Sequence, residues 1–167
     1  DFTSMWVLGL GADQNYYILD GVRDRLNLAE RGKEIMRLHR KWKPQEVRYE
    51  RYGMMADIQY VRELQERENY RFDVTEVAGR LKKEDRIRRL IPLFEEARVY
   101  FPEAMYYTDR EGTPHDLVTE FLEKELIAFP AGLHDDMLDS LSRICEPDLP
   151  LVWPMPEEDP EPKPDRY

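Results

Sequence analysis

The alternation of short strand-forming segments with segments of helical periodicity is the feature that most constrains the fold of this chain. Residues 5–10 (MWVLGL) and 16–21 (YYILDG) flank a turn cluster and predict a β-hairpin. Further strands are predicted at 46–50, 72–77 and 98–101, and helices at 28–42, 55–67, 83–97, 116–128 and 134–143. Strands that alternate with helices are typical of an α/β domain with a mixed sheet.

Two helices carry local signals of their own. The stripe of apolar residues over 83–97 contains Pro92, which we expect to kink that helix. The helix over 116–128 follows Thr113-Pro-His-Asp116, which is typical of a capped helix start.

The composition indicates one folded domain followed by a tail. Hydrophobic residues make up 41% of the 167 residues, enough for one core, which we place in residues 1–145. Residues 146–167 are rich in Pro and acids and are predicted to be a disordered or loosely draped tail. The chain enters its first strand almost at once and has no initial Met, so we expect it to be a piece of a longer protein.

The single cysteine, Cys145, excludes an internal disulfide framework and a cysteine-based zinc site, and it fits a reducing compartment. The sequence has no signal-peptide pattern and no apolar run of about 18 residues that could span a bilayer. We therefore expect a cytoplasmic protein that does not act at a membrane.

The charge balance argues at first against a simple polyanion binder, because 35 acidic residues face 25 basic ones. The tail from Glu146 carries seven of the acids and only Lys163 and Arg166, so the folded part is close to −5. Basic residues cluster between Lys33 and Lys43 and between Arg80 and Arg89. Either cluster could contact phosphate, although a solvated helix face is the simpler interpretation.

Three aromatic residues invite the idea of base stacking, namely Tyr106, Tyr107 and Trp153. Such residues more often belong to the core or its rim.

The densest chemistry is the segment from His134 to Asp139, which contains three aspartates in six residues. Asp136 and Asp139 are three apart, so both carboxylates are expected on one face of the first helical turn, where they could share a cation. Alternatively, Asp135 and Asp136 cap the helix and meet the positive end of its dipole. A cap needs only one acid, which favours the cation.

Glu50 ends a predicted strand, and reacting groups in α/β sheets gather at the carboxyl ends of strands. By itself, Glu50 could simply pair with Arg48 or Arg51 at the surface. Together with the aspartates it forms a set of oxygen ligands suited to Mg²⁺ or Mn²⁺. Two such ions can stabilise the attacking and leaving oxygens of a phosphodiester.

Taken in order, several blocks resemble the C-terminal nuclease domain of the large terminase subunit of tailed bacteriophages. The last block, in which Phe-Pro precedes His-Asp-Asp-x-x-Asp, is the most specific. The matching blocks are Asp1-Phe-Thr, Asn15-Tyr-Tyr-Ile-Leu-Asp20-Gly-Val-Arg23-Asp-Arg25, His39-Arg-Lys-Trp42-Lys-Pro44, Val47-Arg-Tyr-Glu50, Lys83-Glu-Asp-Arg86-Ile87, Leu93-Phe94-Glu95, Arg98-Val-Tyr-Phe101-Pro102, and Phe129-Pro130 with His134-Asp-Asp136-Met-Leu-Asp139-Ser-Leu141.

The resemblance implies an RNase H-like fold, with a mixed sheet flanked by helices on both faces. It also implies a metal-dependent endonuclease that uses two Mg²⁺ or Mn²⁺ ions to cut concatemeric double-stranded DNA during genome packaging. The setting would be the host cytoplasm, for a phage or prophage protein. The partners would be the ATPase domain of the same full-length chain, the portal and the small terminase subunit.

The resemblance also assigns roles to individual residues. Glu50 matches the metal ligand carried by a strand, Asp136 matches the aspartate of the final motif, and Asp139 is its companion ligand. Asp135 is a weaker ligand that would orient the site. Lys83 and Arg86 match a basic helix start, which implies phosphate contact or structural support.

In one respect the chain departs from the family. The family's first strand carries an aspartate several residues before the segment that begins here with Asp1, so we expect the first strand to be truncated in this chain, and Asp1 is a poor substitute for that aspartate. We therefore expect weak cleavage or none from this chain alone. Two alternatives stay open: another RNase H-like nuclease, such as a dimeric Holliday-junction resolvase, and a non-catalytic docking module of the packaging motor.

Overall fold

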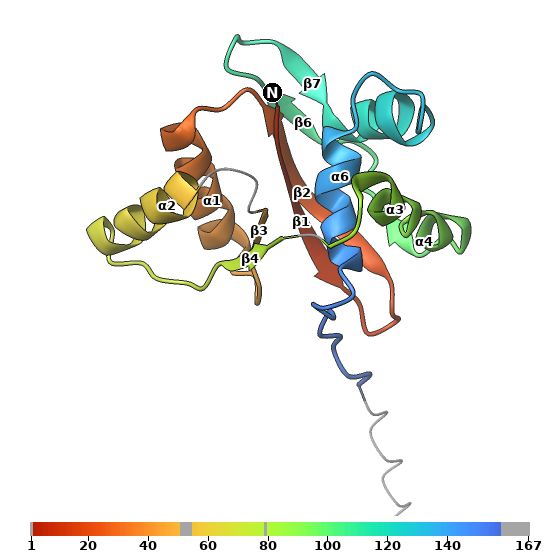
Figure 1. The fold of residues 1–167 in the computed structure, drawn as a ribbon, viewed down its shortest axis with the longest axis horizontal. Helices are drawn as coiled ribbons and strands as arrows, with labels where there is room; N and C mark the ends of the chain where they lie inside the picture. Colours follow the sequence, from red (N-terminus) through yellow and green to blue (C-terminus); the bar gives the residue numbers. More distant parts are fainter. Residues whose placement is uncertain (1, 51–54, 79, 158–167) are drawn as a thin grey trace, which may run out of the picture.

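A long antiparallel hairpin forms the centre of the fold, as predicted. The structure, a computed structural model, describes residues 2–50, 55–78 and 80–157. β1 (Thr3–Leu10) pairs with β2 (Tyr16–Asp24), with a register shift between Val7 and Leu8. β5 (Val99–Tyr100) joins the other edge of β2 in parallel, which gives the sheet order β1-β2-β5 (Figure 1).

Two smaller strand pairs complete the β structure of the described ranges. β3 (Arg48–Glu50) and β4 (Thr75–Val77) pair in parallel, and β6 (Tyr106–Thr108) and β7 (Pro114–Asp116) pair antiparallel. Within the described residues, β1 has a strand partner on one edge only. The fold is mixed α/β with a mixed sheet, so the predicted class is confirmed at that level.

The first two predicted helices are observed as α1 (Leu28–Trp42) and α2 (Met55–Arg67). α1 begins with a capping box: the Asn27 side chain accepts the N–H of Glu30, and the Glu30 carboxylate accepts the N–H of Asn27. It ends at Lys43, whose left-handed backbone conformation returns an N–H to the carbonyl of His39.

The single helix predicted over 83–97 is wrong, because two short helices occupy that stretch. α3 (Lys83–Arg88) stops before Leu90, and α4 (Ile91–Glu95) begins with Pro92 in its first turn. Proline has no N–H to donate to a carbonyl four residues back, and its ring collides with that carbonyl. The helix therefore breaks and restarts instead of merely kinking.

The stretch from 106 to 128 also differs from the prediction. The β6–β7 hairpin was not predicted, and the helix that follows is mostly a π-helix. Asp116 caps α5 (Leu117–Thr119), as its motif indicated, and the chain then widens into η1 (Glu120–Leu126). After η1, the N–H of Ile127 binds the carbonyl of Leu122, five residues back.

The last helix, α6 (Asp136–Ser142), starts two residues later than predicted and runs into a 3₁₀ turn, η2 (Arg143–Cys145). α6 lies along the hairpin on one side, with α3 and α4 beyond it, and α1 and α2 lie on the other side (Figure 1). Contacts agree with this arrangement: Trp6 donates to the carbonyl of Met137 in α6, whereas Asp20 accepts from Lys41 and Trp42 of α1.

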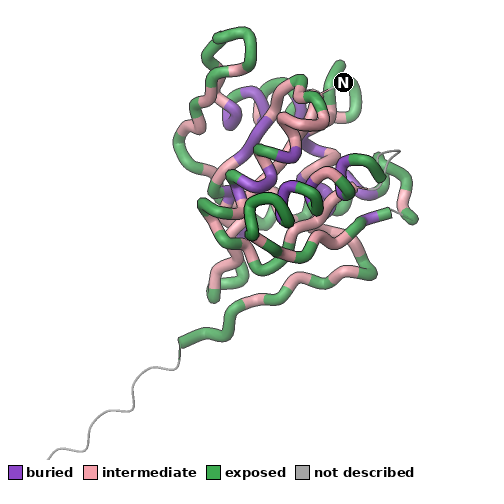
Figure 2. Tube along the Cα trace, turned by 90° about the vertical axis from the view of Figure 1, so that its left-hand side faces the viewer, coloured by how far each residue is buried: buried purple, intermediate pink, exposed green. Residues whose placement is uncertain are grey.

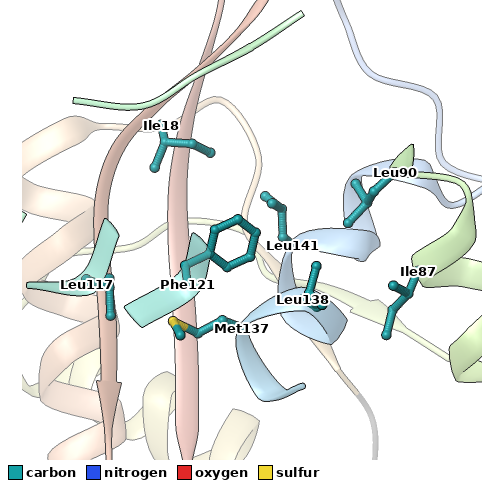
Figure 3. Packing of buried hydrophobic residues seen from close by; sticks show 8 residues of the cluster. All are labelled: Ile18, Ile87, Leu90, Leu117, Phe121, Met137, Leu138 and Leu141. Atoms are coloured by element: carbon teal, nitrogen blue, oxygen red, sulfur yellow. The ribbon is translucent and has the colours of Figure 1, made fainter. Parts of the chain in front are cut away.

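The core fills the space between the hairpin, α3, the α5–η1 segment and α6. Phe121 and Leu117 are completely buried, and the half-buried Cys145 packs against the edge of the same cluster. Figure 3 shows the buried members of the cluster, which are Ile18, Ile87, Leu90, Leu117, Phe121, Met137, Leu138 and Leu141.

Beyond η2 the chain is extended and mostly exposed as far as residue 157 (Figure 2). It is not free of the domain, since the ring of Trp153 packs edge-on against Tyr16 and Arg48 donates to the carbonyl of Leu149. The domain boundary predicted at residue 146 stays a prediction. The last ten residues of the predicted tail lie outside the described ranges. No helix in the described ranges is long and apolar enough to cross a bilayer.

Candidate site on helix α6

Helix α6 takes its N-terminal cap from a distant side chain. Asp135 stands at the N-cap position but makes no capping hydrogen bond with its side chain. Instead, the N–H groups of Met137 and Leu138 donate to Oε2 of Glu125, at 2.8 and 2.9 Å. The capping by Asp135 and Asp136 that the alternative expected is therefore wrong, because Glu125 accepts these two donors. Asp136 does lie in the first turn, where an acid meets the positive end of the helix dipole, as the same alternative expected.

Asp136 and Asp135 are turned outward from the first turn of α6. Asp136 is 32% exposed and has Nη2 of Arg23 at 3.9 Å and Nδ1 of His134 at 4.0 Å, contacts too long for hydrogen bonds. Asp135 accepts a 2.6 Å bond from Lys83. Burial by itself would lower the pKa of Lys83, but the bond to Asp135 and the negative charges of Asp135, Asp139 and Asp136 together outweigh it, and the pKa is raised.

Asp139 forms an ion pair with Arg86 of α3, whose side chain is only 2% exposed. The same guanidinium donates to Oγ of Ser142 at 2.9 Å, so Arg86 joins α3 to α6 at two places. Its geometry is that of structural support, the second of the two roles that the resemblance implied. Lys83, the other residue for which the resemblance implied phosphate contact, is exposed and bonded to Asp135, and Lys82, Arg88 and Arg89 beside it are exposed as well.

Glu50 reaches α6 from the end of β3, where its carboxylate forms an ion pair with Arg143. It does not pair with Arg48, which binds Glu46 and two backbone carbonyls, and Arg51 lies outside the described residues. The structure thus brings the strand-borne carboxylate to the same helix as the aspartates. It meets that helix at its far end, seven residues or about 10 Å along the axis from Asp136.

The donors fit a hard divalent cation in kind but not in arrangement. All four predicted ligands are carboxylates, as Mg²⁺ and Mn²⁺ prefer. Each of them faces a different basic side chain: Glu50 faces Arg143, Asp135 faces Lys83, Asp136 faces Arg23 and Asp139 faces Arg86. Across residues 2–50, 55–78 and 80–157, no three His, Cys, Asp or Glu side chains are grouped to hold a metal ion. No chemical step through a metal can be derived from this arrangement.

A buried charged cluster beside Asp136 was not predicted from the sequence. Arg23 lies 3.6 Å from Oε1 of Glu125 and 3.7 Å from Oε2 of Glu120, and all three side chains are at least nine-tenths buried. Burial raises the pKa of Glu125. In an α-helix, residues 120 and 125 would be about 140° apart. The i→i+5 bonding of η1 instead turns both acids toward Arg23.

The two basic clusters differ in their partners. On α1, Arg37 pairs with Glu34, Arg40 with Glu68 and Lys41 with Asp20. Beside α6, Lys82, Arg88 and Arg89 are exposed, and Arg88 lies over the ring of Phe129. The second cluster is paired in part as well, since Lys83 binds Asp135, Arg86 binds Asp139 and Arg80 lies 3.7 Å from Asp148. Both clusters are therefore partly neutralised.

Of the aromatic residues considered for base stacking, two are packed. Tyr107 stacks on His115 at the edge of the core, and Trp153 packs on Tyr16. Tyr106 is 81% exposed.

No protein-family model matches the chain, and neither does any curated protein.

Proposed function

We propose that this chain is the nuclease domain of a viral DNA-packaging terminase, with an RNase H-like fold and two divalent cations bound between Glu50 and the aspartates of α6. Its substrate would be concatemeric double-stranded DNA. The ATPase domain, the portal and the small subunit would be its partners, in the cytoplasm of the host.

The observation that carries the proposal is the placement of acids on α6. Because Glu125 caps the helix, Asp135 and Asp136 are free of that role and stand outward at its start. Asp139 follows one turn later, and Glu50 comes to the same helix from the carboxyl end of β3. The four acids, none of which caps the helix with its side chain, are oxygen donors of the kind that Mg²⁺ and Mn²⁺ prefer.

The fold supports the proposal at a coarser level. A mixed sheet with helices on both sides is what the resemblance implies (Figure 1).

One observation favours a second candidate, a non-catalytic docking module. Each proposed ligand already has a basic partner, and the described residues hold no preformed group of three metal ligands. In a docking module these ion pairs would simply stabilise the surface that meets the motor.

Manganese binding separates the two candidates. We expect the chain to bind Mn²⁺, as followed by electron paramagnetic resonance, and Asp136→Asn to weaken that binding at least tenfold because a direct ligand is lost. Asp73→Asn, an exposed acid far from α6 in the sequence, is the matched control and should bind as the wild type does.

Nicking of supercoiled plasmid in Mn²⁺, compared between the wild type and Asp136→Asn, then tests the reaction. Equal Mn²⁺ binding by the wild type, Asp136→Asn and Asp73→Asn would contradict a metal site at Asp136 and leave the docking module as the better candidate.

A further inference from the structure

His115, in β7, lies between two acids that belong to different parts of the fold. Its Nε2 is 2.8 Å from Oδ2 of Asp109, in the turn between β6 and β7. Its Nδ1 is 2.7 Å from Oε1 of Glu120, in η1. The ring also stacks on Tyr107 of β6. His115 thus joins the turn of the small hairpin to the π-helix beside the core.

The two bonds fix the protonation state of the ring. An ionised carboxylate only accepts hydrogen bonds, so a ring nitrogen that bonds to it must carry a hydrogen. The bond from His115 and the N–H of Thr113 lower the pKa of Asp109, which keeps this carboxyl ionised. Both nitrogens of His115 face carboxylates, and only the imidazolium carries a hydrogen on each nitrogen. A neutral ring keeps one bond and turns a lone pair toward the other acid.

The acid at the turn also organises the turn itself. Oδ1 of Asp109 accepts the N–H of Glu111 at 2.9 Å and the N–H of Thr113 at 2.8 Å, while Oδ2 receives His115. β6 and β7 contribute only three residues each to the ladder. The bonds of His115 are therefore a large part of what holds this hairpin closed.

Other charged or titratable groups surround the ring on several elements. Glu120 has two further basic neighbours, Lys124 at 3.4 Å and Arg23 at 3.7 Å, so it keeps cations nearby when His115 is neutral. Histidine is the side chain whose charge ordinarily changes near neutral pH. The groups around His115 are Asp109, Arg110 and Glu111 of the turn, Tyr107 of β6, Arg23 and Asp24 of β2, and Glu120 and Lys124 of η1.

We propose that the β6–β7 hairpin carries a pH-sensitive lock: the doubly protonated ring of His115 fastens the turn to η1, and the loss of one ring proton releases it. Hydrogen bonds to Asp109 and Glu120 raise the pKa of His115 above 6.5. The lock is therefore closed below the raised pKa and opens as the pH rises through it. The His115 side chain is 24% exposed, so its proton exchanges with solvent. This inference does not depend on the proposed function.

Three substitutions separate the proton from the packing. His115→Gln removes the titrating ring. Asp109→Asn keeps an oxygen for the N–H groups of the turn and replaces the other oxygen with an NH₂ group, which can donate to the ring. A neutral His115 then bridges the turn and η1 without a second proton. His134→Gln, at a histidine that is 53% exposed and lies outside the hairpin, is the matched control.

The experiment measures amide protection factors at Glu111 and Thr113, which divide out the base catalysis of exchange itself. Between about pH 5.5 and about pH 9 we expect protection in the wild type to fall about tenfold, because a hydrogen bond to a charged partner is lost. The midpoint should coincide with the titration of the His115 ring protons by NMR. His134→Gln should show the same fall.

The other two variants should lose the pH dependence in opposite ways. His115→Gln should have low protection at both pH values, because it lacks the bridging cation. Asp109→Asn should keep high protection at both, a pattern that general destabilisation would not produce. The inference is overturned if protection in the wild type does not change with pH, or if Asp109→Asn loses protection as the wild type does. If His115→Gln does not fold, the wild type, Asp109→Asn and His134→Gln decide the question.

Discussion

Helices α1 and α6 lie on opposite sides of the same hairpin and are held in place by different means (Figure 1). α1 carries its own cap, because Asn27 and Glu30 satisfy each other's N–H groups within one turn. α6 depends on residues far along the chain: Glu125 caps it, Arg86 holds its middle and Arg143 at its end binds Glu50. When residues from other elements cap a helix, its own acids are left to face solvent. When a helix is capped by its own residues, an acid such as Glu30 is taken up by the cap.

The largest effect should come from removing the anchor at the middle of α6. Arg86→Met leaves Asp139 without its buried cation and Ser142 without its donor, which should lower the free energy of unfolding by about 3 kcal/mol. Urea denaturation measures the loss. Arg88→Met, at an exposed position of the same helix α3, is the control and should change the free energy of unfolding by less than about 0.5 kcal/mol. Similar losses in the two variants would show that α6 does not depend on this anchor.

Removing the local cap of α1 should lower the free energy of unfolding by less than removing Arg86 does. Asn27→Ala removes the side-chain half of the capping box and should lower the free energy of unfolding by about 1 kcal/mol in the same assay. A loss as large as that of Arg86→Met would mean that α1 is not the self-sufficient helix described above.

A substitution at the N-cap position of α6 should hardly change the free energy of unfolding. Asp135 stands at the N-cap but caps nothing, and its bond to Lys83 is solvent-exposed, so Asp135→Ala should cost about 0.5 kcal/mol or less. If this loss equals that of Asn27→Ala, Asp135 caps α6 after all and the contrast between the helices disappears.

The smallest effect is a difference in how two histidines respond to pH. Hydrogen bonds to Asp109 and Glu120 raise the pKa of His115, in β7, above its ordinary value of 6.5. Its contribution to stability is present in full below that value and is lost as the pH rises through the raised pKa. Burial lowers the pKa of His39, in α1, so its contribution is present above 6.5 and is lost as the pH falls through the lowered pKa.

Titration of the histidine ring protons by NMR should therefore place His115 above 6.5 and His39 below it. If the two histidines titrated at the same pH, the predicted difference between His39 in α1 and His115 in β7 would not exist.

The same contrast explains how far the sequence predicted the structure. The hairpin, α1 and α2 were predicted correctly because their signals are local: apolar stripes and alternation, with turn residues between them. The β6–β7 hairpin was missed because Tyr106–Thr108 and Pro114–Asp116 show no alternation of apolar and polar residues, and the second segment has the pattern of a helix start. The break at Leu90 was underestimated because Pro92 can either kink a helix or end it, and the sequence does not decide between them.

For the candidate site, the sequence placed the acids on their elements but could not predict what surrounds them. Asp136 and Asp139 lie in the first turn of one helix, and Glu50 ends a strand, as predicted. Their partners come from remote positions, with Arg143 93 residues from Glu50 and Arg86 53 residues from Asp139. Glu125 was missed for a further reason, since a regular α-helix over 116–128 would have turned it away from Glu120.

The packing of Cys145 against the core has a practical consequence. Burial raises the pKa of its thiol to about 11. At neutral pH only about one thiol in ten thousand would then be the reactive thiolate. Leu133, just before α6, is 96% exposed. A spin label attached through Leu133→Cys should therefore react almost exclusively at that position, next to the acids of α6, without prior removal of the native cysteine.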